Sequence, residues 1–371
     1  MDQPVSPLGE YRPLEGLKVI ELASVLAGPL AGTFLLELGA EVIKVEHPSS
    51  GGDVTRQWRA QGESSDGVSA YYAAANGPKQ VVFLDLSNEE DRKSLDDWLS
   101  DADILLQNFK DASLARLNLM PAHLAKRYPE LIHLHLQGFL NEPNRPGYDM
   151  VVQAETGLMA LNGEPGHSPF RMPVAMMDIL AAHQMRSAVL LALWEREKDG
   201  MGSYVRVWLD ASGLGALVNR GTEQLVGGSE PQPLGAAHPQ IAPYGESFDC
   251  ACGGRVVLAV GNDRQFQALC AALDCPEIAA DSRFISNPDR VQNRVELAGL
   301  LATALVRIQR DDLLDIGRLH GIPMGRLNSV SEALNHPTGR AMTAKFELEG
   351  HTVKHVRQVA FNVQRNGSFN T

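Results

Sequence analysis

The sequence has few cysteine and aromatic residues and no excess of basic residues. Of its 371 residues, only four are cysteine and only 6% are aromatic. Cys250-Ala-Cys252 is spaced more tightly than the cysteines of zinc knuckles, and no histidine pair completes a site. The formal net charge of −12 leaves no excess of basic residues for a nucleic-acid footprint. We therefore expect reduced thiols, no metal and no nucleic-acid partner.

Two further absences concern location. The N-terminal stretch lacks the charged region and the apolar region of a secretory signal. No uninterrupted apolar run approaches the length of a membrane span. Hydrophobic content of 44% and charged content of 21% are ordinary for a globular protein. We expect a soluble, cytoplasmic protein that does not insert into a membrane.

What is present begins with a strand–helix–strand unit. Residues 17–22 read as an apolar strand, 30–38 as a helix that Gly39 ends, and 41–46 as a second strand. This order within about thirty residues predicts a βαβ unit and a parallel sheet. No Gly-x-Gly-x-x-Gly follows the first strand, but the turn before the helix can still present N–H groups to a phosphate or a carbonyl.

Later strands extend the predicted sheet. Residues 80–86, 102–107 and 131–136 read as strands, and Ser87 is the predicted N-cap of a helix reaching about Ser100. Ligands bind at the carboxyl ends of strands in open α/β sheets, and Asn108 and Phe109 fall at such an end.

The segment from Gly147 to Gly202 contains the most unusual carboxylate. Asp178 stands in an apolar run and precedes a helix-like pattern. Because an ionised carboxylate in such surroundings is costly unless paired, its functional interpretation is a nucleophile or acid/base tuned by partial burial. The alternative is a helix N-cap, and residue type alone favours that alternative because caps are far commoner.

Taken together, these segments resemble the class III coenzyme A transferases, the CaiB/BaiF group of the formyl-CoA transferase-like superfamily. The resemblance runs from about Leu14 to about residue 340. Its markers are the segments 14–22, 27–29, 39–46, 108–109, 147–202, 241–244, 261–266, 281–284 and 321–323.

The resemblance implies a fold and an assembly. It implies an α/β protein with a Rossmann-like large domain built on a parallel sheet, a smaller α/β domain and an interlocked homodimer. The large domain is expected over residues 1–210, completed by about 325–371, and the small domain over 225–320, with 211–224 as a linker.

The resemblance also implies a chemistry. Asp178 corresponds to the family's catalytic aspartate, which attacks an acyl-CoA thioester to give an anhydride and then an aspartyl-CoA thioester. A small carboxylic acid, the acceptor, then passes through the same steps in reverse and leaves as its CoA ester. Coenzyme A and acyl-CoA are thus substrates, and no tightly bound cofactor is implied. This reverses the preference for a cap, although one carboxylate can serve both roles. The implied CoA-binding positions are Val25, Leu26, Ala27, His47, Ala75, Asn108, Phe109 and Arg116.

The sequence departs from the family pattern in several places. His47 replaces an arginine, and Leu26 replaces the glutamine of formyl-CoA transferases, which argues against oxalate and formate as substrates. The tetraglycine loop of that branch is expected to be absent, and the chain is expected to stop short of the family's usual C-terminal segment.

Two alternatives remain open. An acyl-CoA racemase or epimerase of the same fold uses a histidine where this chain has Tyr148, and a phenol is a poor base near neutrality. The other is a non-catalytic acyl-CoA binding protein, which the intact Asp178 disfavours.

Overall fold

The computed structural model describes residues 11–363, which form two compact units. Within the described residues, unit 1 comprises 11–159, 171–231 and 334–363, and unit 2 comprises 160–170 and 232–333. Unit 1 is therefore built from three separate stretches of chain. No helix in the described part of the chain is long and apolar enough to cross a membrane.

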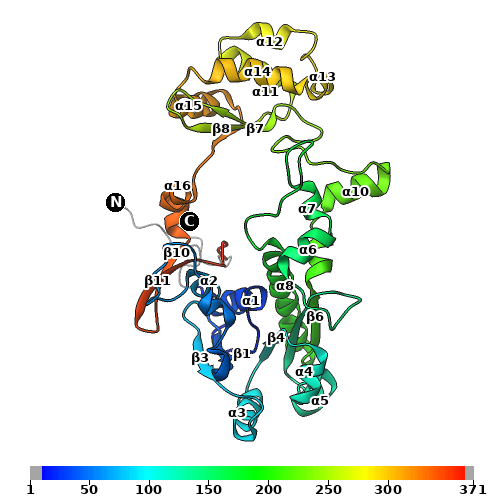
Figure 1. The fold of residues 1–371 in the computed structure, drawn as a ribbon, viewed down its shortest axis with the longest axis vertical. Coiled ribbons are helices and arrows are strands. Elements are labelled where there is room, and N and C mark those ends of the chain that lie inside the picture. Colours follow the sequence, from blue (N-terminus) through cyan, green and yellow to red (C-terminus); the bar gives the residue numbers. More distant parts are fainter. Residues whose placement is uncertain (1–10, 364–371) are drawn as a thin grey trace. The chain divides into compact units, whose positions relative to one another are not determined.

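A six-stranded parallel sheet forms the centre of unit 1 (Figure 1). The strands follow the order β3-β2-β1-β4-β5-β6. Their bounds are β1 (Lys18–Glu21), β2 (Glu41–Glu46), β3 (Gln80–Phe83), β4 (Ile104–Gln107), β5 (Ile132–Gln137) and β6 (Tyr204–Trp208). The order reverses between β1 and β4, so the turn after β1 and the turn after β4 border the crevice where open α/β sheets bind ligands.

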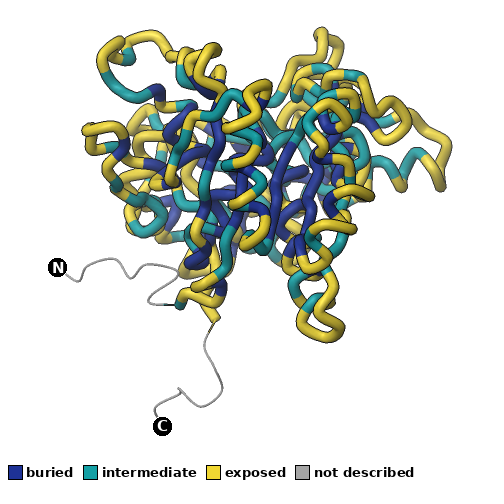
Figure 2. Tube along the Cα trace, turned by 90° about the horizontal axis from the view of Figure 1, so that it is seen from below, coloured by how far each residue is buried: buried dark blue, intermediate teal, exposed yellow. Residues whose placement is uncertain are grey.

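Both faces of the sheet are covered, because apolar residues on successive strand positions point to opposite sides. Val19 and Leu106 pack in one core cluster with α1 (Ala27–Glu37) and α8 (Met176–Asp199). Ile20 and Leu105 pack in the other with α3 (Glu89–Leu99), α4 (Asp111–Arg116) and α5 (Pro121–Arg127). Figure 2 shows the buried residues gathered along the sheet strands between these layers.

The remaining elements of the first two stretches of unit 1 are short. They are η1 (Pro48–Ser50), η2 (Val54–Gln57), α2 (Ala70–Asn76), α6 (Asp149–Glu155), α7 (Leu158–Leu161), α9 (Leu209–Gly215) and α10 (Val218–Gly227). Residues 211–224, expected to be a linker, thus include the end of α9 and the first part of α10.

The third stretch of unit 1 returns to the start of the chain. It contains α16 (Val330–Asn335), which begins in unit 2, α17 (Pro337–Ala341) and the antiparallel hairpin of β10 (Thr343–Leu348) and β11 (His351–Val356). After the hairpin, the backbone N–H groups of Gln358 and Val359 donate to the Glu37 carboxylate at 2.9 and 2.8 Å. Residues more than three hundred positions apart are joined in this way.

Unit 2 has its own core. A three-stranded antiparallel sheet of β7 (Tyr244–Asp249), β8 (Arg255–Ala259) and β9 (Met324–Arg326) packs its apolar residues with those of the surrounding helices. The helices are α11 (Asp263–Ala272), α12 (Pro276–Ala280), α13 (Asn287–Gln292), α14 (Arg294–Leu305) and α15 (Arg310–His320).

Local details differ from the sequence-based expectations. Helix α1 begins at Ala27 rather than Leu30, since a proline such as Pro29 is tolerated in a first turn. Asn88, not Ser87, is the N-cap of α3, and its side chain accepts from the Glu90 N–H at 2.8 Å. Of the segment 325–371 that was expected to complete the large domain, residues 364–371 lie outside the described part of the chain.

Candidate active site

A cavity of about 870 Å³ opens beside the turns that follow β1, β2 and β4 in unit 1. Ala23 and Ser24 line it from the first turn, and Phe109 lines it from the turn after β4. Its basic lining residues are Lys44, His47, Arg92 and Arg116, and its acidic lining residues are Glu46, Asp53 and Asp85. A cavity that combines apolar walls with several cations suits a ligand that has a ring system and phosphate groups.

The turn between β1 and α1 is fixed by side chains from elsewhere in unit 1. Asn108 accepts from the Ser24 N–H at 3.2 Å and donates to the Ser24 carbonyl at 3.1 Å. The Asp53 carboxylate accepts from the Val25 N–H at 3.1 Å. Val25 has a φ of 73°, which is a genuine outlier for a β-branched residue. The N-cap residue of α1 is Leu26, whose side chain makes no capping hydrogen bond.

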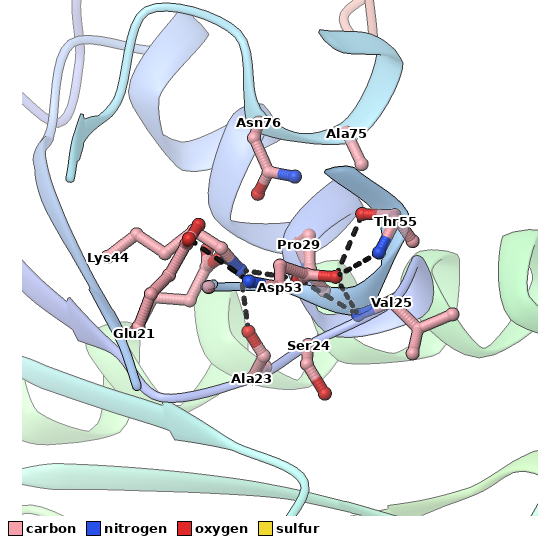
Figure 3. A network of polar contacts seen from close by, with 12 residues as sticks. Glu21, Ala23, Ser24, Val25, Pro29, Lys44, Asp53, Thr55, Ala75 and Asn76 are labelled. Atoms are coloured by element: carbon pink, nitrogen blue, oxygen red, sulfur yellow. Dashed lines mark hydrogen bonds and ion pairs between the residues drawn. The ribbon is translucent and has the colours of Figure 1, made fainter. Parts of the chain in front are cut away.

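A buried charge network of Glu21, Lys44, Asp53 and Lys79 adjoins this turn. Figure 3 shows Glu21, Lys44 and Asp53 of this network beside the turn. The Lys44 ammonium contacts Glu21 at 3.1 Å and Asp53 at 3.2 Å, and the Lys79 ammonium contacts Glu21 at 2.9 Å. Burial opposes ionisation of Asp53, but Lys44 and the Thr55 donors outweigh it and hold the pKa of that carboxyl below its usual value.

Asp178 lies on the other side of the same turn. It is the third residue of α8 rather than its cap, because the N-cap is Ala175. The first turn of α8 is bonded instead by Asp149 of α6, which accepts from the Met177 N–H at 2.8 Å. The expectation that Asp178 caps its own helix is therefore wrong, and its carboxylate is left available for another role.

The surroundings of Asp178 disfavour its charge. Burial, together with the like charge of Asp149, raises the pKa of Asp178 to about 7, while a hydrogen bond from the Ala27 backbone N–H works in the opposite direction. A carboxyl that titrates near neutrality beside the N-terminus of α1 has the properties of a reactive group.

Tyr71 of α2 faces these carboxylates. Burial and then the charges of Asp178, Asp149 and Asp53 raise the pKa of Tyr71 to about 12, so its hydroxyl keeps its proton near neutral pH. Its ring packs edge-on against Trp58 at a centroid distance of 5.0 Å. A neutral phenol at this point is a hydrogen-bond donor for a carboxylate or a carbonyl oxygen.

The turn after β4 is fixed by buried polar side chains of the sheet. Gln107 accepts from the Phe109 N–H at 2.5 Å, and His135 Nε2 lies 2.9 Å from the Phe109 carbonyl. Nδ1 of His135 lies 2.8 Å from the Tyr204 hydroxyl. Burial lowers the pKa values of His133 and His135, so both rings are neutral and serve to position the turn.

Of the sequence-predicted site residues, His47, Phe109 and Arg116 line the cavity, and Val25, Leu26 and Ala27 belong to the turn beside it. Ser24 on the cavity side and Ala27 on the Asp178 side frame the predicted contacts Val25 and Leu26. His47 is exposed, and its Nε2 lies 3.4 Å from an Asp85 carboxylate oxygen at the cavity rim. Arg116 is exposed at the end of α4.

Ala75 is set apart from the cavity. Its side chain is fully buried in a small apolar cluster with Leu30 and Ala182. Its carbonyl accepts from Thr33 Oγ1 at 2.6 Å and from Lys79 Nζ at 2.9 Å.

Sequence reasoning missed several residues of this region: Glu21, Lys44, Asp53, Tyr71, Lys79, Arg92 and Asp149. One signal could have found part of the network. Glu21 and Lys44 are charged residues inside short apolar strands, and charges in such strands are almost never buried unless they are paired.

No group of three or more His, Cys, Asp or Glu side chains between residues 11 and 363 is placed to hold a metal ion. Cys250, Cys270 and Cys275 are buried free thiols, and Cys252 is an exposed free thiol.

The fold and the site together define an α/β protein with a cavity at the switch point of a parallel sheet. The family model for CoA-transferase family III matches residues 14–369. The chain belongs to this family and is a CoA-transferase.

Curated relatives and solved structures agree with this assignment. The succinate–glutarate CoA-transferase of Agrobacterium fabrum is 37% identical over 91% of this chain and 85% of its own length. The acetyl-CoA:oxalate CoA-transferase of Acetobacter aceti is 34% identical over 90% and 85%. Human succinyl-CoA:glutarate CoA-transferase is 30% identical over 95% and 80%. The crystal structure of a CAIB/BAIF family protein from Brucella suis has a TM-score of 0.81 at 36% identity, covering 94% of this chain and 92% of that one.

Proposed function

We propose that this enzyme moves coenzyme A from an acyl-CoA to a small carboxylic acid through covalent intermediates on Asp178. The observation that carries the proposal is the environment of Asp178. Burial and Asp149 raise the pKa of Asp178 to about 7, and its carboxylate accepts the Ala27 N–H of the turn whose other end lines the cavity. The same turn thus contacts both the nucleophile and the ligand space.

The steps balance as two anhydride exchanges. An Asp178 oxygen attacks the thioester carbonyl, the carbon–sulfur bond breaks, and CoA thiolate leaves a mixed anhydride behind. The thiolate attacks the aspartyl carbonyl of that anhydride, which gives an aspartyl-CoA thioester and the free donor acid. The acceptor carboxylate attacks this thioester to form a second anhydride, and the released thiolate attacks its acyl carbonyl, which regenerates Asp178 and yields the new CoA ester.

The electrostatic repulsion between Asp178 and Asp149 supports this order of steps. Asp178 must be ionised to attack, and its negative charge then lies close to that of Asp149. As the new bond forms, the charge moves from the Asp178 oxygen to the departing sulfur, so the repulsion is relieved. The Ala27 N–H can stabilise an oxyanion at the aspartyl carbonyl in the later steps.

The cavity beside the turn supports placing coenzyme A there. His47, Arg92 and Arg116 can meet its phosphates, and Phe109 offers an apolar surface for its ring system. The pantetheine arm would then cross the turn at Val25 and Leu26 toward Asp178.

We propose small dicarboxylates as the acids. The relatives in Agrobacterium fabrum and in humans are named for glutarate and succinate or succinyl-CoA. Leu26 removes the glutamine expected for formate and oxalate chemistry, and the neutral Tyr71 phenol can donate a hydrogen bond to a carboxylate.

Racemisation on this fold is less well supported. Tyr148 occupies the place of the racemase base, and its side chain is exposed. No imidazole therefore stands opposite Asp178 at that position.

The experiment is to trap the covalent intermediate. The enzyme is incubated with succinyl-CoA alone, treated with hydroxylamine or borohydride, digested, and mapped by mass spectrometry. We expect the label on Asp178 and none in the Asp178→Asn variant. Absence of any label, with deuterium exchange at the acyl α-carbon, would replace transfer with racemisation. Binding of succinyl-CoA without label, exchange or transfer to glutarate would leave a non-catalytic binding protein.

We also propose a homodimer, interlocked as in the family. Leu225 and Val226 of α10 are 87% and 83% exposed, which is unusual for large apolar side chains unless a partner covers them. Sedimentation at micromolar concentration tests the proposal, and a monomer there would contradict it.

A further inference from the structure

The buried charge network of Glu21, Lys44, Asp53 and Lys79 takes no part in the proposed chemistry. The four side chains are at most 5% exposed, and their formal charges cancel. Burying ion pairs gains little stability over apolar residues of the same volume, because desolvation offsets the attraction. A role other than stability is therefore worth seeking in what these side chains touch.

Three of the four charged groups, Lys44, Asp53 and Lys79, contact the first βα turn or its flanks in addition to their ion-pair partners. Lys44 Nζ donates to the Ala23 carbonyl at 2.7 Å, and Lys79 Nζ donates to the Pro29 carbonyl at 2.8 Å. Between these points, Asp53 accepts from the Val25 N–H. The network thus contacts the turn at its start, Ala23, at its middle, Val25, and at its end, Pro29, which are labelled in Figure 3.

Helix α1 rests directly on the network. A Cβ on Gly32 would lie 1.9 Å from Glu21 Oε2, and a Cβ on Gly28 would lie 2.4 Å from the Ala23 Cβ. Neither distance is accessible to real atoms, so both positions need glycine. The first two turns of α1 therefore pack closely against Glu21 and Ala23.

The middle of the turn holds a strained residue. Val25 has a φ of 73°, where its β-branched side chain crowds the backbone, and such outliers persist only when the surroundings impose them. The imposing contact is the Asp53 carboxylate, itself fixed by Thr55 N–H at 3.0 Å and Thr55 Oγ1 at 2.8 Å. Two residues later comes Ala27, whose N–H meets Asp178.

We propose that the buried charge network is a positioning device, with Asp53 at its centre, that keeps Val25 left-handed so that the Ala27 N–H faces Asp178. The network acts on Asp178 through the turn and is therefore a positioning group, although Lys44 and Asp53 also line the cavity. The inference rests on the proposed role of Asp178. It assigns the placement of the reactive carboxylate's hydrogen-bond donor to residues in other elements, β1, β2, the loop before η2 and the loop after α2.

The test compares Asp53→Ala, the milder Asp53→Asn and the double variant Val25→Gly/Asp53→Ala. Glycine adopts positive φ without strain, so it should restore part of what the lost carboxylate imposed. We expect Asp53→Ala to lower kcat for succinyl-CoA/glutarate transfer by about 100-fold, with KM changed much less. Asp53→Asn should be intermediate, and the double variant should recover about tenfold.

The pH profile of Asp178 labelling distinguishes positioning from simple electrostatics. The charged or titratable groups that bear on the Asp178 carboxyl are Asp149 from α6 and Tyr71 from α2. Removing the negative charge of Asp53 can only lower the pH at which Asp178 ionises. Losing the Ala27 N–H contact raises it. We therefore expect the labelling profile of Asp53→Ala to move upward by about one pH unit.

Hydrogen exchange supplies a readout that does not depend on the reaction. Amides in residues 22–30 should exchange faster in Asp53→Asn while the rest of unit 1 keeps its protection. The matched control is Asp101→Asn, because Asp101 pairs with Lys18 at an exposed site away from the cavity and should leave every readout unchanged.

The outcomes separate the two proposals. If wild-type enzyme labels Asp178 but Asp53→Ala retains kcat, or its profile moves downward, the positioning role is overturned and the transfer mechanism stands. If the wild type never labels Asp178, the mechanism fails. The exchange experiment then still decides whether the network holds the turn.

Discussion

Asp53 and Asp178 lie on opposite sides of one turn, and the same burial has opposite consequences for them. Burial opposes the charge of both. At Asp53 the Lys44 ammonium and the Thr55 donors outweigh burial and lower the pKa, whereas at Asp178 the like charge of Asp149 adds to burial and raises the pKa to about 7. A compensated carboxylate becomes part of the scaffold, and an uncompensated one becomes reactive.

The largest expected effect lies on the reactive side of this comparison. Asp178→Asn removes the proposed nucleophile, so transfer from succinyl-CoA to glutarate should fall by about 10⁴-fold or more. Steady-state turnover followed by chromatography of the CoA esters measures the loss. Binding of CoA, measured by calorimetry, should persist. Retention of more than a tenth of the activity would mean that another group carries the acyl transfer.

The next effect lies on the scaffold side. Lys44→Met leaves Glu21 and Asp53 buried with one cation fewer, which should destabilise unit 1 by about 3–5 kcal/mol. Thermal unfolding with a probe in unit 1 measures the change. Lys18→Met is the matched control, because its exposed pair with Asp101 should contribute nothing measurable. Equal effects of the two substitutions would remove the distinction between scaffold and surface charges.

A smaller expected effect is a gain in stability, whereas substitution of a buried residue usually lowers the free energy of unfolding. The pKa of Asp178 is about 7 in the folded protein against an ordinary value of 3.8, so the folded state binds more protons between these values. Stability therefore falls as pH rises from about 4 to 7, and the cost of the charge is complete above 7. Asp178→Asn should stabilise the enzyme by about 2 kcal/mol at pH 8, about half the full linkage value because the side chain is partly exposed.

The gain from Asp178→Asn should vanish near pH 4, where the carboxyl is protonated in both states. Denaturant unfolding of the wild type and the variant at both pH values measures it. A variant less stable than wild type at pH 8 would mean that Asp178 is already compensated.

The smallest effect tests the coupling of the carboxylate pair. Asp149→Asn keeps an acceptor for the Met177 N–H but removes the like charge, so the pKa of Asp178 should fall. The acid limb of the labelling profile should move down by about one pH unit. Single-turnover labelling across pH 5–8 measures it, and an unmoved limb would leave burial as the sole cause.

Much of the fold was accessible from local patterns. The βαβ unit at residues 17–46 and the strand that ends at Asn108 follow from apolar periodicity and glycine punctuation, and β1, β2 and β4 confirm them. The helix boundaries were less accessible. α1 starts earlier because Gly28 and Pro29 are accommodated in its first turn, a fact that depends on the close contact with Ala23.

The candidate site, like the fold, was only partly predictable from the sequence. Asp178 and the turn after β1 were identified because they resemble a known family, not because spacing revealed their chemistry. Tyr71, Asp149 and the buried charge network were missed, since nothing in a linear pattern indicates that Glu21, Lys44, Asp53 and Lys79 converge.

By itself, the sequence determined the strands and the helix of the βαβ unit, because these depend on residue type and local period. It also carried the resemblance to a known family that identified the candidate nucleophile. Only the tertiary structure decided which carboxylate is compensated and which is not. That decision depends on distances between groups on different elements: Lys44 to Asp53, the Ala27 N–H to Asp178, and Asp149 to the first turn of α8. The electrostatic free energy depends on the distances between the charged groups and on their burial, and neither can be obtained from the order of residues alone.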